Sequence, residues 1–357
     1  MMGPIRIKPE AAWSEVQTLG RKLAAGAQVL RGIDAKSVHY GATEKEEIFR
    51  IDKVVLYRFR GTSTPTAEVP IVVAYALVNR PYMIDLQEDR SIVRNLLAQG
   101  EDVYLIDWGY PDAADRFVSM DDYINRYMRR CIDVVRERHD LDAINLLGIC
   151  QGGVFSLCFA SIYPEKVLNL ITMVTPVDFH TPDNMLSNWT QGVDVDLAVD
   201  VLGNIPGDLM NSSYLSLKPF RLNLQKYVGL LDILDDPIEV ENFLRMEKWI
   251  FDSPDQAGEA FRQFNKEFYQ ENRMMRGGTM VGSRKVDPRN VTMPILNIYA
   301  EQDHLVPPSA SKPMRGIVGT DDYSELAFKG GHIGLYVSGR AQREVPSAIH
   351  EWLAART

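Results

Sequence analysis

The sequence predicts an α/β fold with a mostly parallel central sheet and helices on both faces. Short apolar segments of strand length alternate with helical segments in the first half of the chain and again near its end. Such alternation is typical of parallel strands joined by right-handed helical crossovers. Between about 179 and 289 the alternation stops, and helical patterns rich in aromatic residues and methionine predict a helical cap inserted into this core.

Each core element follows from its own pattern. The run at 70–79 is continuously apolar, as in a parallel strand covered on both faces. The segment 121–139 has apolar residues at a spacing of about 3.6, which predicts a helix that buries Cys131. In chain order the patterns predict a helix at 9–31, strands at 53–62 and 70–79, a helix at 91–98, a strand at 102–107, a helix at 121–139, strands at 144–147, 168–174, 294–300 and 323–328, and a closing helix at 341–355.

We therefore divide the chain into an N-terminal helical segment at 1–40, a core at 41–178 and 290–357, and a cap at 179–289. The helix at 9–31 is amphipathic, and its apolar side either packs on the protein's own core or contacts a partner. The cap's aromatic residues either form its own core or shield the site beneath it. The sequence leaves both pairs of interpretations open.

Composition narrows the class of protein. A hydrophobic content of 45% and a charged content of 24% are ordinary for a soluble globular enzyme. The longest apolar run, 71–78, is too short to span a bilayer, and the N-terminus has no apolar signal-peptide core. Three cysteines provide no disulfide framework, which fits the cytoplasm, and a net charge of -9 argues against general nucleic-acid binding. We find no metal-ligand spacing and no phosphate-binding loop, and we expect no cofactor.

The stretch from Leu146 to Gly153 has the pattern of a nucleophile elbow. It reads glycine, any residue, Cys150, any residue, glycine, and it joins an apolar strand to a helical pattern. Glycines on either side let the strand and helix pass closely around a strained turn. Cys150 stands where serine is usual. The alternative is a glycine-rich turn with a buried, inert cysteine, which is how we interpret Cys158 in the following helix.

Two further residues follow predicted strands directly. Asp303 comes after the strand at 294–300, and His332 comes after the strand at 323–328. Ligands of open parallel sheets bind beyond the carboxyl ends of the strands, so both side chains are expected beside Cys150. The order nucleophile, acid, histidine is that of the α/β-hydrolase fold. His304 and Asp322 are alternatives to Asp303. Neither of them combines the right residue type with a position at the end of a strand. We expect solvated or structural roles for the remaining histidines: His39, His139, His180 and His350.

These residue types suit acyl transfer. His332, as a general base, would take the proton of Cys150, and the helix that begins at Gln151 would favour the thiolate. The backbone N–H groups of Gln151 and Val78 would form the oxyanion hole. Transfer from a thioester to a cysteine keeps the acyl group activated, which suits its delivery to an alcohol. An apolar cap would then protect the acyl-enzyme from water.

Several motifs together resemble the polyhydroxyalkanoate synthases over essentially the whole chain. They are Gly148 to Gly152, Tyr75 to Leu86 (YALVNRPYMIDL), Asp107 to Pro111, Asp303 to Pro307, and Gly330 to His332. The resemblance implies polymerisation of (R)-3-hydroxyacyl-CoA into polyester with release of coenzyme A. It also implies that Cys150 is the nucleophile, that His332 is the base, and that the carboxylate of Asp303 helps to activate the 3-hydroxyl group.

The chain length and the TPVDF segment resemble the catalytic subunit of the class III, two-subunit synthases, because the long N-terminal extension of single-subunit synthases is lacking. That class favours short monomers such as 3-hydroxybutyryl. The resemblance implies a second, non-catalytic synthase subunit, a homo- or hetero-oligomer, and a cytoplasmic location at polyester granules. Two other functions stay open: a thioesterase or other hydrolase of the same fold with a cysteine nucleophile, and a non-catalytic granule scaffold, which the intact triad disfavours.

Overall fold

The computed structural model describes residues 10, 13–18, 20–21, 24, 39–220 and 225–356. The chain divides into two compact units. The smaller comprises Met1–Tyr40 with Asn211–Phe251, and the larger comprises Gly41–Met210 with Asp252–Thr357. Most of the predicted helix at 9–31 lies outside the described residues, although 13–18 are helical. The predicted domain boundaries at 40, 178 and 289 stay a prediction.

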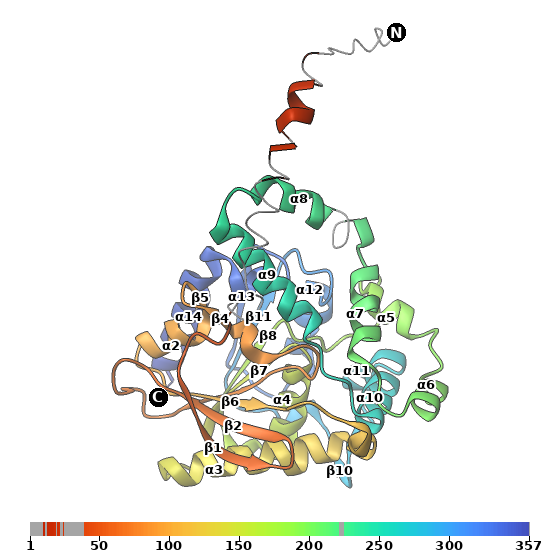
Figure 1. The fold of residues 1–357 in the computed structure, drawn as a ribbon. Coiled ribbons are helices and arrows are strands. Elements are labelled where there is room, and N and C mark those ends of the chain that lie inside the picture. Colours follow the sequence, from red (N-terminus) through yellow and green to blue (C-terminus); the bar gives the residue numbers. More distant parts are fainter. Residues whose placement is uncertain are drawn as a thin grey trace, which may run out of the picture. The chain divides into compact units, whose positions relative to one another are not determined.

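An eight-stranded sheet organises the larger unit, in the order β1-β2-β6-β3-β7-β8-β11-β12 (Figure 1). The pairs β1–β2 and β2–β6 are antiparallel, and every pairing from β6 to β12 is parallel. The predicted mostly parallel sheet is confirmed. Its strands are β1 (Lys45–Ile51), β2 (Val54–Phe59), β3 (Ile71–Ala74), β6 (Val103–Asp107), β7 (Ile144–Ile149), β8 (Val167–Met173), β11 (Ile295–Ala300) and β12 (Tyr323–Phe328).

Helices join these strands, and short two-stranded pairings lie outside the main sheet. The α-helices are α2 (Ile92–Ala98), α3 (Arg129–His139), α4 (Gln151–Ile162), α5 (Met185–Thr190), α6 (Val195–Leu202), α7 (Gly207–Ser216), α8 (Lys226–Ile233), α9 (Pro237–Phe251), α10 (Gly258–Phe264), α11 (Arg273–Arg276), α12 (Pro308–Ser311), α13 (Gly334–Val337) and α14 (Gly339–Ala354). The shorter or irregular elements are η1 (Pro81–Ile84), β4 (Asp85–Gln87), β5 (Arg90–Ser91), η2 (Ala113–Phe117), η3 (Asp122–Met128), η4 (Pro164–Lys166), η6 (Asn265–Gln270), β9 (Met280–Val281), β10 (Arg284–Lys285), η7 (Pro288–Asn290) and η8 (Lys312–Gly316).

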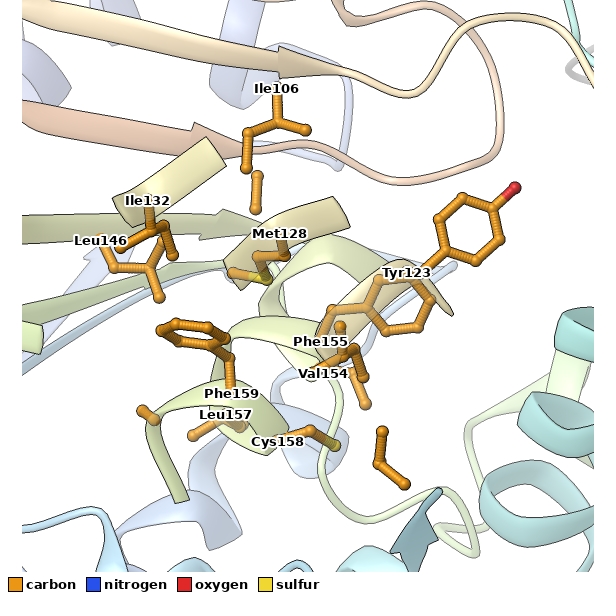
Figure 2. Close-up of a cluster of buried hydrophobic side chains, with 14 of the residues drawn as sticks. Ile106, Tyr123, Met128, Ile132, Leu146, Val154, Phe155, Leu157, Cys158 and Phe159 are labelled. Carbon is orange, nitrogen blue, oxygen red and sulfur yellow. The ribbon is translucent and has the colours of Figure 1, made fainter. Parts of the chain in front are cut away.

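Helices cover both faces of the sheet, α3 and α4 on one and α2 and α14 on the other (Figure 1). Alternate side chains of β3 reach opposite faces because strand side chains alternate. Val72 and Ala74 belong to the same apolar cluster as α3 and α4. Figure 2 shows this cluster, with Phe155 and Cys158 of α4 pointing into it. Cys131 and Cys158 are both fully buried, so their predicted place in the core is confirmed.

The prediction of one long strand at 70–79 is wrong. β3 ends at Ala74, and the chain then leaves the sheet because polar groups from other segments bind its backbone. The indole N–H of Trp108 donates to the carbonyl oxygen of Tyr75 at 2.8 Å. The N–H of Leu77 donates to the side-chain oxygen of Gln151 at 3.0 Å. This bend matters because it carries Val78 to the start of α4 rather than along the sheet.

Two other elements differ from the predicted pattern. The predicted helix at 121–139 begins as the π-helix η3 and continues as α3, so its apolar side drifts from ideal spacing. The strand β1 is not among the predicted strands. It lies at the antiparallel edge and is partly exposed, so its sequence, KEEIFRI, carries charged residues. Within the described ranges, no helix is both long and apolar enough to cross a membrane.

The insertion between β8 and β11 is mostly helical, as expected. Several of its aromatic residues pack inward: the rings of Phe264 and Phe268 lie 4.9 Å apart, and that of Phe264 lies 5.9 Å from Phe155 in α4. These residues therefore form core. In the smaller unit, Tyr227 and Phe243 pack at 6.0 Å, whereas Phe220 is 76% exposed. Packing into core thus accounts for Phe264 and Phe268, whereas the interpretation that cap aromatic residues shield the site stays a prediction.

Candidate active site

Cys150 lies at a sharp turn between β7 and α4. Its φ of 54° and ψ of -118° belong to a region that non-glycine residues rarely adopt. Such backbone strain concentrates at functional sites, where surrounding packing holds it in place. The turn leaves Cys150 only partly buried, in contrast to Cys131 and Cys158. Of the three cysteines, Cys150 is therefore the one available to a substrate.

Two glycines make this turn possible. A Cβ atom on Gly152 would overlap the backbone carbonyl oxygens of Ala74 and Tyr75. A Cβ atom on Gly148 would overlap Ser156 in α4. Only glycine permits the strand and helix to approach so closely, as the elbow pattern predicts.

His332 and Asp303 are hydrogen-bonded to each other. The Nδ1 atom of His332 lies 2.6 Å from Oδ2 of Asp303. The other carboxylate oxygen accepts the backbone N–H groups of Leu305 and Val306 at 2.8 and 3.0 Å. The side chain of Asp303 is fully buried and that of His332 is 9% exposed. The carboxylate is thus held by three donors and turned towards the histidine.

The two loops are also tied to each other through their backbones. The N–H of Gln302 donates to the carbonyl oxygen of Gly330 at 2.8 Å, one step beyond the last pairing of β11 with β12. The parallel register of neighbouring strands therefore carries Asp303 and His332 to the same edge. The alternative acid, Asp322, lies before β12 and pairs with Arg356 at 2.7 Å, so it takes no part in this arrangement.

The surroundings of His332 favour its protonated form. Burial lowers its pKa, but the charge of Asp303, the hydrogen bond to Asp303 and a hydrogen bond to Cys150 together raise it to about 10. The effect of Cys150 on this pKa indicates that the thiol and the imidazole interact. By contrast, burial raises the pKa of Cys131 to about 12, which keeps that thiol protonated and unreactive.

The predicted oxyanion donors, Gln151 and Val78, belong to two segments that the hydrogen bond between Leu77 and Gln151 joins. Gln151 is the first residue of α4, where backbone N–H groups have no acceptor within the helix. The side-chain oxygen of Gln151 accepts a hydrogen bond from the N–H of Leu77. The side chain of Gln256 donates to the carbonyl oxygen of Leu77 at 2.9 Å. Both glutamines thereby fix the backbone that leads into Val78. The assignment of Val78 and Gln151 as oxyanion donors stays a prediction.

Sequence reasoning missed Tyr336, a fully buried residue of α13. Its ring lies edge-on to the His332 imidazole, with centroids 6.0 Å apart. Burial, followed by the charges of Tyr75, Cys150 and Asp303, raises its pKa. The sequence signal that could have identified Tyr336 was its position four residues after His332, in the short helix α13.

Other histidines make structural contacts. His139 bonds to the hydroxyl of Tyr104 at 2.8 Å, and His350 bonds to Glu101 at 2.8 Å. His180 contacts the carbonyl oxygen of Tyr269 at 3.0 Å. Among the residues that the structure describes, there is no cluster of three or more histidine, cysteine or acidic side chains suited to hold a metal ion.

Comparison with known proteins agrees with this geometry. Residues 70–338 match the family model of the alpha/beta hydrolase fold. The chain is 58% identical to the poly(3-hydroxyalkanoate) polymerase subunit PhaC of Allochromatium vinosum, over 99% of this chain and 100% of that protein. It is 50% identical to the subunit of the same name from Synechocystis, over 94% and 90% respectively. Among solved structures, a putative non-heme bromoperoxidase BpoC from Mycobacterium tuberculosis covers 87% of the chain and 99% of its own length, with a TM-score of 0.53 and 14% identity, which indicates a shared fold only.

Proposed function

Because the chain belongs to the family of poly(3-hydroxyalkanoate) polymerase subunits PhaC, acyltransferases with the α/β-hydrolase fold, we propose that it polymerises (R)-3-hydroxyacyl-CoA and releases coenzyme A. The observation that carries the chemistry is the hydrogen-bonded pair of His332 and Asp303, with Cys150 at the elbow acting on the His332 imidazole. We take a short monomer, 3-hydroxybutyryl-CoA, as the substrate to test.

In the first step Cys150 becomes acylated. The thiolate of Cys150, paired with the imidazolium of His332, attacks the carbonyl carbon of the acyl-CoA thioester. The N–H groups of Gln151 and Val78 stabilise the resulting oxyanion. When the intermediate collapses, the bond to the CoA sulfur breaks and His332 gives that sulfur its proton. The acyl group is then a thioester on Cys150, and His332 is neutral.

In the second step the chain grows by one unit. Neutral His332 accepts the proton from the 3-hydroxyl of an incoming 3-hydroxyacyl-CoA, and that oxygen attacks the thioester carbon on Cys150. An ester bond forms, the bond to the cysteine sulfur breaks, and the thiolate–imidazolium pair returns. Attack of this thiolate on the lengthened acyl-CoA then releases coenzyme A and reloads Cys150.

Asp303 supports both steps through His332. Its carboxylate accepts the Nδ1–H of the imidazole, which leaves the other ring nitrogen to exchange protons with sulfur or hydroxyl. Since the carboxylate is fully buried and already has three donors, we favour this indirect role over direct contact with the 3-hydroxyl. The resemblance to the synthases implies that Asp303 helps to activate this hydroxyl, and an effect transmitted through His332 satisfies that implication.

We further propose that the chain acts with a second, non-catalytic subunit at the surface of polyester granules in the cytoplasm. In support, the relatives are themselves named subunits of a polymerase. A polyester is insoluble, so the enzyme that extends it must work at the surface of its own product.

One assay distinguishes the possible functions. The purified protein is incubated with 3-hydroxybutyryl-CoA, and free CoA, free 3-hydroxybutyrate and insoluble polyester are each quantified. We expect CoA release matched by polymer. CoA release matched by free acid would indicate a thioesterase, and release of neither would indicate a scaffold. The control is Cys150→Ala, which should form no product, alongside Cys158→Ala, which alters a cysteine outside the site.

A further inference from the structure

The hydroxyl group of Tyr336 is buried beside the catalytic residues without a partner. Tyr336 is 1% exposed. Its phenolic oxygen forms no hydrogen bond with any of the residues that the structure describes. Buried polar groups are nearly always satisfied, so an orphaned hydroxyl at a functional site needs an explanation. A bound substrate is the simplest source of the missing partner.

The surroundings of this hydroxyl locate that partner. The ring packs edge-on against His332, and the charges of Cys150 and Asp303 both act on the phenol. Asp303 cannot easily serve it, because its carboxylate already accepts from His332, Leu305 and Val306. The hydroxyl therefore remains available to bind a group carried on the cysteine.

An acyl group on Cys150 would bring an oxygen into this region. In a 3-hydroxyacyl thioester, the carbonyl carbon and two further carbons separate the sulfur from the 3-oxygen. This oxygen is a hydroxyl in the first acyl group and an ester oxygen in a growing chain, and either form can accept a hydrogen bond. A fatty acyl group without a 3-substituent has no such acceptor and would leave the phenol unsatisfied.

We propose that the hydroxyl of Tyr336 binds the 3-oxygen of the acyl group on Cys150, and so selects 3-hydroxyacyl groups over unsubstituted ones. This inference rests on the proposed function and adds a specificity residue to it. A site built to hydrogen-bond a substrate oxygen discriminates against analogues that lack it, because its own buried polar group is then left unpaired.

The test compares two acyl donors in a single turnover. Wild-type protein and Tyr336→Phe are each mixed with 3-hydroxybutyryl-CoA or butyryl-CoA, and acylation of Cys150 is followed by intact-protein mass spectrometry. We expect the wild type to favour the hydroxylated donor by about tenfold, the value of one hydrogen bond, and Tyr336→Phe to bring the ratio close to one. In Tyr336→Phe, the rate of acylation by 3-hydroxybutyryl-CoA should decrease, whereas the rate of acylation by butyryl-CoA should stay unchanged or increase.

Tyr323→Phe is the matched control, because it removes another buried phenolic hydroxyl at the far end of β12 from the site. It should keep the wild-type ratio. Tyr336→Met, with an adaptable apolar side chain, gives a second variant should phenylalanine disturb folding, and thermal unfolding checks both.

An unchanged ratio in both Tyr336 variants would overturn the inference. So would an equal loss with the two donors, accompanied by a shifted pH profile for alkylation of Cys150, since the phenol would then act on the nucleophile. A wild-type protein that is acylated by neither donor would instead refute the proposed function, and the inference with it.

Discussion

Nδ1 of His332 lies 2.6 Å from Oδ2 of Asp303, although 29 residues separate them in the chain. The parallel pairing of β11 with β12 produces this contact, because both residues follow their strands by a few positions. Neither side chain needs a long or flexible loop to reach the other. The geometry of this pair is thus set by the register of the sheet.

The protonation of His332 should make stability depend on pH. Its folded pKa of about 10 lies above the ordinary value of 6.5, so the bound proton stabilises the fold fully below about pH 6.5. That contribution should be lost as the pH rises towards about 10. Urea unfolding of wild type and His332→Gln should therefore show a stability difference that shrinks over this range. His350→Gln serves as control, and a difference independent of pH would contradict the raised pKa.

Replacement of Cys150 should abolish catalysis, because it alone of the cysteines lies at the elbow and acts on the pKa of His332. Cys150→Ala should release no CoA and form no polymer, while Cys131→Ala and Cys158→Ala should keep turnover. The two buried cysteines still support packing, so their loss should cost about 1 kcal/mol in the free energy of unfolding. Full activity of Cys150→Ala would end its assignment as the nucleophile.

Removal of the Asp303 carboxylate should affect elongation more than acylation. A cysteine thiol is acidic and nucleophilic, whereas the alcohol of an incoming monomer needs a stronger base. Asp303→Ala should release about one CoA per site and then stall. Asp303→Asn should behave similarly while keeping an acceptor for the N–H groups of Leu305 and Val306.

Rapid-quench measurement of CoA separates the burst of acylation from the later steady rate. Asp322→Asn is the matched control, since that carboxylate pairs with Arg356 away from the site. If the burst and the steady rate fell by the same factor in Asp303→Ala, the carboxylate would serve both steps equally.

A methyl group on Gly152 should disrupt the elbow. It would overlap the carbonyl oxygens of Ala74 and Tyr75, which are backbone atoms and cannot rotate away. Gly152→Ala should cost about 1–3 kcal/mol in the free energy of unfolding and most of the acylation rate. Gly316→Ala is the control, because a Cβ atom there meets nothing within 4 Å. Equal stability of the two variants would show that the elbow can relax around a side chain.

Full activity should require a second, non-identical subunit. A cap that shields the acyl-enzyme from water must also let CoA enter and polyester leave, which suits a two-state element. A partner that binds the open form more tightly would shift the population towards it. The purified chain should therefore show a lag or a low specific activity that the presumed partner subunit relieves. Full activity without a lag and without gain from the partner would rule out this dependence.

The order and type of the core elements could be predicted because they depend on local periodicity. Cys150, Asp303 and His332 each follow a strand, and parallel strands bring such positions to one edge. The early end of β3 could not be predicted, since it depends on Gln151, 74 residues away from the Leu77 N–H that it binds. Tyr336 could not be predicted as a site residue for a related reason. Only the folded structure shows that its hydroxyl lacks a hydrogen-bond partner among the described residues.

The insertion begins after β8 and ends before β11, yet these two strands are direct neighbours in the sheet, with Ile295 paired to Leu170. The sheet therefore closes without any contribution from the intervening chain. The hydrogen bond of His332 with Asp303 also lies outside that segment, because both residues follow strands that come after it in the chain. An exchanged segment would still have to supply the side chain of Gln256, because that side chain binds the carbonyl oxygen of Leu77 next to the predicted oxyanion donor Val78.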